Sequence, residues 1–212
     1  MAAWTLTYAG TTKTFAEWGL RGLRRAQASQ ATGSVTLRQS GASFDGAPLF
    51  AIDALVTISK DGVPWHKGPV VSVPRDAGPT SEGLDYEIAD PWWYLEQLPY
   101  EQQIAIGMSS GNTTRISLFG SVSDGHTVKL SVQGVIINVI GLVVTAGASM
   151  SVSFSGSFGV SPPIADMRDP TCAEIIRAAL RWAPDATTGW YYGTTVEAAP
   201  VLIIATRGGA AA

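Results

Sequence analysis

The chain has 212 residues, of which only 15% are charged, and its 17 acidic and 14 basic side chains give a formal net charge of −3. Soluble domains usually carry about 25% charged residues, so this composition favours a protein whose surface is covered by neighbours in an assembly. The acidic balance argues against a protein that binds nucleic acid stably through a basic face.

Residues 1–100 predict a β-domain. The clearest pattern is residues 54–59, where Val56 and Ile58 fall on one face and polar residues on the other, as in a half-buried strand. Asp61-Gly62 then supplies a tight turn. The return strand, residues 63–73, contains two prolines and a glycine, which predicts an edge strand or a bulge. Further strands are expected at residues 4–8, 34–38 and 86–90, whereas residues 15–27 are ambiguous between helix and strand.

Residues 101–165 form a Gly/Ser/Thr-rich block, predicted to be a β-insertion or a second small β-domain. Its longest apolar run, residues 135–144, is rich in β-branched side chains and is interpreted as one or two buried strands. The run is too short for a membrane-spanning helix, which needs about 20 residues, so no transmembrane segment is expected. Residues 149–155 alternate and predict another strand.

Residues 166–212 predict a short α+β part with a frayed tail. Thr171 and Glu174 have the spacing of a capping box, so a helix should begin there. The run 182–185 should end it, and two strands should follow at residues 190–192 and 201–204. The whole chain is therefore predicted to be mainly β, with one or two short helices.

The aromatic run 92–94 raises an alternative function, a carbohydrate-binding β-sandwich that stacks sugars on an exposed Trp92 or Trp93. Adjacent residues on a strand point to opposite faces, and on a helix they diverge by about 100°. The two rings therefore cannot form one flat platform. Core filling with one interface contact is the preferred interpretation.

The search for catalytic, cofactor-binding and metal-binding residues ends with none predicted, and no cofactor is expected. Asp85 and Glu87 share a strand face, and with Asp90 they would be the carboxylates of a peptidoglycan hydrolase, a third and weaker hypothesis. Among possible triad members, His66 lies near Asp61, and neither Ser72 nor Ser81 has the context of a nucleophile.

Cysteine and basic residues give equally little sign of chemistry. Cys172 is the only cysteine, so no intramolecular disulfide can form, and with His66 and His126 alone it cannot make a zinc site. Arg21, Arg24 and Arg25 form a basic cluster, with Lys13 and Arg38 further away, interpreted as a solvated or interface-facing patch. The first residues lack the basic start and apolar run of a secretory signal, so synthesis in a cytoplasm is expected.

Several segments together carry a resemblance to a known family. They are residues 44–50, Asp53, Val56, Ile58, 61–62, 65–70, Glu82, Tyr86 and 90–96, followed by 166–176 and 182–185. These segments resemble the tail hub proteins of tailed bacteriophages, the baseplate-hub or tail-tip family. The resemblance implies a small β-barrel in which an aromatic-Leu segment closes the first domain, and a helix that begins the next hub domain.

The resemblance also implies a structural and not an enzymatic role. A hub of this family forms a homo-oligomeric ring, commonly a trimer, at the distal end of the tail tube in the virion. It joins the tail tube or distal tail protein to tip or fibre proteins and opens for genome ejection. Edge strands of the predicted β-domain would be available for pairing between subunits.

Overall fold

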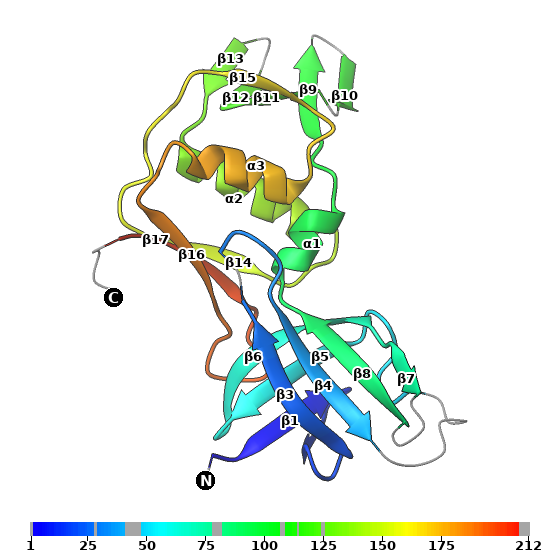
Figure 1. Cartoon of the computed structure of the whole chain (residues 1–212). Coiled ribbons are helices and arrows are strands. Elements are labelled where there is room, and N and C mark those ends of the chain that lie inside the picture. Colours follow the sequence, from blue (N-terminus) through cyan, green and yellow to red (C-terminus); the bar gives the residue numbers. More distant parts are fainter. Residues whose placement is uncertain are drawn as a thin grey trace. The chain divides into compact units, whose positions relative to one another are not determined.

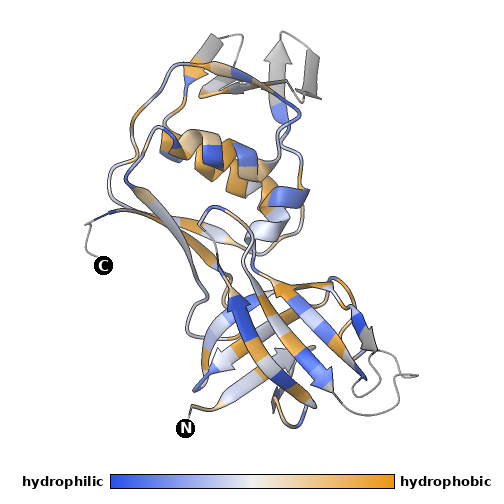
Figure 2. Cartoon of the chain, viewed as in Figure 1, coloured by the Kyte–Doolittle hydropathy of each residue, from blue (hydrophilic) through white to orange (hydrophobic). Residues whose placement is uncertain are grey.

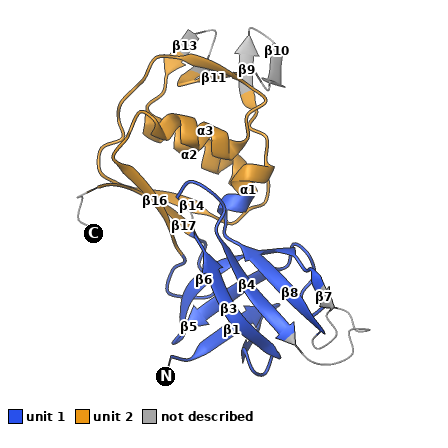
Figure 3. Ribbon diagram, viewed as in Figure 1, with its two compact units in different colours: residues 1–93, 192–200 blue, residues 94–191, 201–212 orange. Residues whose placement is uncertain are grey.

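The computed structural model describes residues 2–27, 29–40, 48–77, 82–106, 109–113, 115–123 and 126–207. The chain divides into two compact units, shown in Figure 3. The first comprises Met1–Trp93 and Tyr192–Pro200, and the second comprises Tyr94–Tyr191 and Val201–Ala212. The three-part division expected from composition stays a prediction.

The first unit is built on one large antiparallel sheet. Its order is β2-β1-β5-β6-β8-β4-β3, with β7 paired to β8 (Figure 1). The path begins at β2 and ends at β3 without a pairing between them, so the predicted closure into a barrel is not found, whereas the mainly β class is confirmed. The strands are β1 (Trp4–Tyr8), β2 (Thr11–Thr14), β3 (Leu20–Ala26), β4 (Ser34–Ser40), β5 (Leu55–Lys60), β6 (Val63–Ser72), β7 (Arg75–Ala77) and β8 (Glu82–Ala89).

Turn chemistry in the sequence explains how these strands are connected. Ala9-Gly10 and Asp61-Gly62 both have positive φ, at 47° and 76° and at 52° and 82°, and they join β1 to β2 and β5 to β6. The ambiguous segment 15–27 is resolved as a turn followed by β3, so it is not a helix.

The prediction of β6 as a possible edge strand is wrong, because β6 pairs with both β5 and β8. The prediction of a bulge is confirmed: register shifts occur between Ile58 and Ser59 on β5, opposite Pro64, and between Val70 and Ser72 on β6. Bulges let a proline-containing strand lie inside a sheet, because a residue there need not donate to the ladder. The half-buried interpretation of β5 is also wrong, since Thr57 and Ser59 are buried with their apolar neighbours.

The core of the first unit is apolar and closes around Phe50. The ring of Phe50 packs edge-on against Tyr8, Trp18 and Tyr86, with centroids 5.0 to 5.5 Å apart. Apolar positions recur along the strands in Figure 2. The buried cluster consists of Leu6, Leu20, Val35, Leu37, Phe50, Val56, Ile58, Val70, Tyr86 and Ile88. Residues 44–47, which carry part of the family resemblance, lie outside the described residues.

The second unit combines two longer helices with small sheets. Its sheets have the orders β10-β9-β12-β13, β11-β15 and β14-β17-β16. The helices are α1 (Trp92–Gln97), which begins in the first unit, α2 (Val132–Thr145) and α3 (Cys172–Leu180). The strands are β9 (Gln102–Ile106), β10 (Ser109–Thr113), β11 (Arg115–Leu118), β12 (Gly120–Ser123), β13 (His126–Lys129), β14 (Ser151–Ser155), β15 (Ala165–Arg168), β16 (Ala186–Tyr191) and β17 (Val201–Thr206).

The run 135–144, predicted as buried strands, is instead the body of helix α2. Ser131 is the N-cap, and its side chain accepts a hydrogen bond from the Gly134 amide at 3.1 Å. The buried positions, Val132, Val135, Ile136, Val139, Ile140 and Val143, follow the spacing of one helix face. That face packs against α3, and packing of this kind outweighs the weak helix propensity of β-branched residues.

Helix α3 confirms the prediction of a capping box. Thr171 Oγ1 accepts from the Glu174 amide at 3.2 Å, and Glu174 Oε2 accepts from the Thr171 amide at 2.8 Å. Ile175, Ile176 and Leu180 are buried. The predicted strands at 149–155, 190–192 and 201–204 correspond to β14, β16 and β17. No helix in the described ranges is long and apolar enough to cross a membrane.

Candidate assembly surfaces

The outer face of α2 is apolar and uncharged. None of the 14 residues of this helix carries a charge, and Ile137 and Val144 lie outside its buried face with exposed fractions of 47% and 43%. A helix in water normally presents charged or polar residues opposite its buried stripe, and a helix apolar all round is usually covered on every side. The outer face of α2, defined here as Ile137, Gly141 and Val144 with the adjacent Asn138, is therefore a candidate contact surface.

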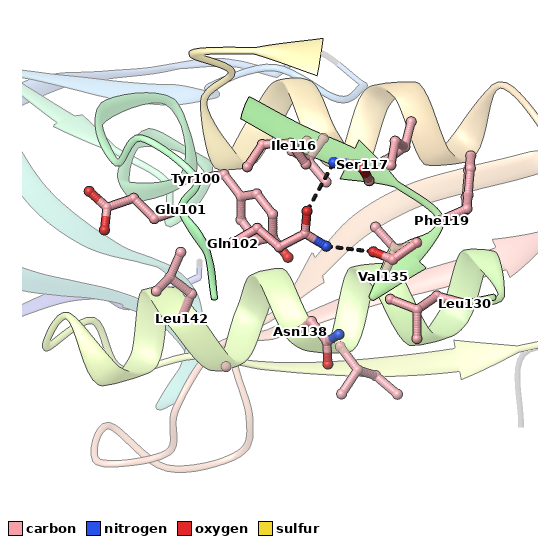
Figure 4. A pocket seen from close by; sticks show the side chains of 15 residues that line it. Tyr100, Glu101, Gln102, Ile116, Ser117, Phe119, Leu130, Val135, Asn138 and Leu142 are labelled. Carbon is pink, nitrogen blue, oxygen red and sulfur yellow. Dashed lines mark hydrogen bonds between the residues drawn. The ribbon is translucent and has the colours of Figure 1, made fainter. Parts of the chain in front are cut away.

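A pocket of about 500 Å³ lies beside this helix, within the second unit (Figure 4). Leu130, Ile137 and Leu142 contribute apolar walls, while Asn138 and Gln102 contribute amides. Pockets of this size are large enough to bury a small ligand or several side chains of a protein partner. The pocket therefore extends the outer face of α2 into a concave surface.

The side chain of Gln102 organises the wall opposite α2. Its Oε1 accepts a hydrogen bond from the Ser117 amide at 2.9 Å, and its Nε2 donates to the Gly120 carbonyl oxygen (Figure 4). One amide group thus satisfies a donor and an acceptor of the backbone, as a neighbouring strand would. This arrangement holds the pocket wall in shape without adding a charge.

The structure assigns Trp92 to the interior. Its side chain is only 1% exposed, whereas Trp93 is half-buried. A ring buried to this degree has no free face for a sugar, so the carbohydrate-binding hypothesis is wrong as far as it rests on Trp92. The preferred interpretation, core filling, is confirmed for this residue.

Two of the three clustered carboxylates have structural roles in the first unit. Asp90 is buried, and its Oδ2 and Oδ1 accept hydrogen bonds from the amides of Gly33 and Trp92 at 2.9 and 3.0 Å. Asp85 lies 3.6 Å from Arg38 in an ion pair. Asp85 and Glu87 do share one face of β8, as predicted, because they lie opposite Arg38 and Thr36 on β4.

His66 is buried and neutral, and its side chain bonds to the backbone and not to its suggested triad partner. Its Nε2 lies 3.0 Å from the Ile88 carbonyl oxygen, which can only accept, so Nε2 carries the proton. Burial lowers the pKa of His66 to about 4, and the positive charge of Arg25 acts in the same direction. Asp61, its suggested partner, instead accepts from the Ala3 amide at 2.7 Å. Ser81 lies outside the described residues.

Cys172 is equally unreactive. The thiol is fully buried, and burial raises its pKa to about 12, so almost no thiolate forms near neutral pH. Across the described part of the chain, no three His, Cys, Asp or Glu side chains are grouped as ligands of a metal ion.

A loop from the C-terminal part of the sequence belongs to the first unit. The segment Tyr192–Pro200 connects β16 to β17, and it is called the strap below. Lys67 Nζ donates to the carbonyl oxygens of Val196 and Ala198 at 2.9 and 3.1 Å, and the Tyr192 ring packs against His66 with centroids 5.7 Å apart. No local pattern indicates this long-range contact, because a lysine and two carbonyl groups form no recognisable motif.

Comparisons with known proteins give matches at the level of structure. No protein-family model matches the chain, and no curated protein sequence matches it. A tail protein from Neisseria meningitidis is similar with a TM-score of 0.58 at 9% identity, over 96% of this chain and 50% of that one. The 43 kDa tail protein of prophage MuSo2 from Shewanella oneidensis gives a TM-score of 0.60 at 11% identity, over 96% and 54%.

A third match comes from a secretion system. A component of the type VI secretion system of E. coli, described as structurally similar to the bacteriophage T4 tail proteins gp27 and gp5, gives a TM-score of 0.52 at 5% identity, over 97% of this chain and 45% of that one. The chain thus spans about half the length of these structures. Its fold is similar to that of these tail proteins. The predicted resemblance to the phage tail hub family is confirmed at the level of the fold.

Proposed function

We propose that the chain is a structural component of a phage tail. The observation that carries this proposal is the likeness of fold to two tail proteins, one of them from a prophage, over 96% of the chain. The low content of charged residues supports it, because subunits of a tail are covered by neighbours over much of their surface. The proposed role is mechanical and requires no catalysis.

The finer proposal is a hub at the distal end of the tail tube. In this role several copies, most simply three, form a closed ring in the virion that joins the tail tube or distal tail protein to tip or fibre proteins. The ring opens for genome ejection. The chain would be made in the host cytoplasm and incorporated at the tail tip. The resemblance in the residues of the first unit and the fold of a gp27-like and gp5-like relative support this position.

The outer face of α2 is proposed as a contact between copies in the ring. A second copy is the proposed occupant because a ring of identical subunits must contact itself through part of its surface. The face has the character of the fully buried core of an interface: it is apolar, lacks charge, and adjoins a concave pocket.

Sedimentation velocity over a broad range of concentration tests the ring and this contact together. The unmodified chain should form a discrete oligomer. The double variant Ile137→Glu/Val144→Glu should sediment as a monomer, because charges would be buried without partners. Ile52→Glu is the control, since Ile52 is also half-exposed but belongs to the first unit. A wild-type chain that stays monomeric at every concentration contradicts self-assembly, and an oligomer unaffected by the double variant contradicts the role of α2.

A further inference from the structure

Strand β3 is a free edge of the large sheet and carries three arginines. The strand order ends at β3, so its outer N–H and C=O groups face no neighbouring strand of the sheet. Arg21, Arg24 and Arg25 are all exposed. An open edge of this kind is a template for another strand, and charges on it decide which strand can pair.

Arg25 differs from the other two arginines because it is already engaged. Its guanidinium lies 4.5 Å from the centroid of the Trp65 ring, which is the geometry of a cation–π contact. Its position opposite Val35 on β4 places it on the same side of the sheet as that buried residue. Arg25 therefore helps to cover the unit, and Arg21 and Arg24 remain for contacts with a partner.

Arg21 and Arg24 continue rows of charge that run across the other side of the sheet. In the first row, Asp85 on β8 lies opposite Arg38 on β4, which lies opposite Arg21 on β3. Asp85 and Arg38 are 3.6 Å apart, so the carboxylate of Asp85 pairs with Arg38. Arg21 therefore lies opposite a like charge. In the second row, Glu87, Thr36 and Arg24 follow one another.

Space for the Arg38 side chain in this row is provided by a glycine. A Cβ atom at Gly83 would lie 2.9 Å from Arg38 Nε, so the absence of a side chain lets the guanidinium lie across β8. Neither Arg21 nor Arg24 makes an ion pair with any described residue. The next position outward in each row is where a carboxylate would complete the alternation of charge.

We propose that the β3 edge docks an extended acidic segment of another protein, which adds to the sheet as a strand and places carboxylates against Arg21 and Arg24. A guanidinium binds a carboxylate through paired hydrogen bonds, while backbone bonds to the edge supply the rest of the contact. This interaction goes beyond the proposed ring and stands independently of it.

A second copy of this chain does not supply such a segment from its described strands. Pairing β3 with another β3 would place arginines opposite arginines, which is unfavourable. The remaining described strands at sheet edges, β2, β7, β10, β11, β13, β14, β15 and β16, carry no net negative charge. The described edge strands of a second copy are therefore poor partners for β3, and the proposed occupant is a segment of a different protein.

The structure also favours a protein strand over nucleic acid at this edge. Two free arginines beside unpaired backbone groups match a strand with acidic side chains, whereas a duplex is bound through many phosphate contacts. The bulge in β3 between Arg21 and Arg24, with Gly22 at a φ of 65°, twists the edge and disfavours indiscriminate strand pairing. The acidic side chains are then needed to select the partner.

A fluorescence anisotropy experiment with the full chain tests the proposal. The probe is a labelled peptide, blocked at both ends, in which Glu alternates with Val and Thr. Binding should weaken at least tenfold in the Arg21→Ala/Arg24→Ala variant. Binding to the unmodified chain should weaken as salt is raised, and it should be lost when alternate amides of the peptide are N-methylated. Lys13→Ala, on the exposed strand β2 at the opposite end of the sheet, should bind as the unmodified chain does.

Three results would overturn the proposal. They are absence of binding to this peptide, equal binding by the Arg21→Ala/Arg24→Ala variant, and equal binding of the N-methylated peptide, which would leave a charge contact without a strand. A single-stranded oligonucleotide that binds more tightly than the peptide, and through the same two arginines, would replace the protein partner with nucleic acid. Far-ultraviolet circular dichroism of each variant checks that these exposed substitutions leave the fold intact.

Discussion

A Cβ atom on Gly68 would lie 1.7 Å from the carbonyl oxygen of Ala89, so β6 and β8 approach each other there more closely than any side chain permits. The neighbouring atom is backbone, which cannot move aside as the end of a flexible side chain could. The close approach lies where β8 ends and where Asp90 begins the turn into α1. This spacing of β6 and β8 therefore requires a glycine at position 68.

Gly68→Ala should lower the free energy of unfolding of the first unit by about 3 kcal/mol, the upper range for inserting an atom into a packed site. Urea unfolding followed by tryptophan fluorescence measures the effect. Gly189→Ala in β16 is the matched control, because a Cβ there would meet no atom within 4 Å. If both substitutions changed stability equally, the close approach of β6 and β8 would not exist as described.

Asp90→Ala should also destabilise the first unit, by about 3 kcal/mol, because it leaves the buried amides of Gly33 and Trp92 without their acceptor. Asp90→Asn retains one side-chain oxygen and should lose less. Chemical denaturation of the two variants in parallel gives the comparison. Equal loss in both would assign the effect to the charge of Asp90 and not to its two hydrogen bonds.

The buried imidazole of His66 predicts a dependence of stability on pH. Its pKa falls from 6.5 to about 4 on folding, so between these values the unfolded chain binds a proton that the folded chain does not. The contribution of the neutral His66 to the free energy of unfolding is therefore fully present above pH 6.5, and it decreases as the pH falls from 6.5 to 4. The total amounts to about 3 kcal/mol at most.

Urea unfolding at neutral pH and at about pH 5 should show this loss of unfolding free energy in the unmodified chain. The loss should be smaller in His66→Gln, whose amide can still donate to the Ile88 carbonyl oxygen. Carboxylates titrate in both proteins, so the difference between the two pH profiles belongs to His66. Parallel profiles would contradict the depressed pKa.

Lys67→Met should loosen the strap without unfolding the sheet. Burial lowers the pKa of Lys67, and the nearby Glu197 carboxylate acts in the opposite direction by raising that pKa. A hydrogen bond from a charged donor contributes about 1.5 to 3 kcal/mol, and Lys67 makes two of them to the strap. Hydrogen exchange of the strap amides should therefore become at least about tenfold faster. Exchange in β5 and β8 should stay unchanged.

Hydrogen exchange mass spectrometry reads both regions at once. Lys13→Met is the control, because Lys13 Nζ lies over the Trp18 ring and makes no contact with the strap. Unchanged exchange in Tyr192–Pro200 after loss of Lys67 would show that the strap is held by its apolar contacts alone.

Local patterns in the sequence were sufficient for much of the fold. The strands β1, β4, β5 and β14, the turn at Asp61-Gly62 and the capping box at Thr171 were all predicted from neighbouring residues, and the structure has each of these elements. The aromatic Trp92 was also predicted to fill the core, since adjacent rings cannot share one ligand face.

Helix α2 was missed because β-branched composition outweighed spacing in the prediction. The buried positions from Val132 to Val143 do follow a helical period, and Ser131 is a suitable N-cap. Counting the period would therefore have identified the helix. Its apolar outer face would still have been missed, because burial on one side and exposure on the other depend on where α3 packs.

The central position of β6 and the strap could not be read from local sequence. The prolines of β6 indicated a bulge correctly, but which strands lie on either side of it is decided by long-range pairing with β8. The contact of Lys67 with the strap joins residues 129 and 131 positions apart in the chain. Such contacts depend on the topology of the whole fold.

Immunogold electron microscopy of phage particles, with antibody raised against this chain, tests whether the protein is a tail component. Gold is expected at the distal end of the tail, in intact or in tail-disrupted particles. Absence of label from both kinds of particle, with the antibody still binding the purified chain, would contradict a role in the tail.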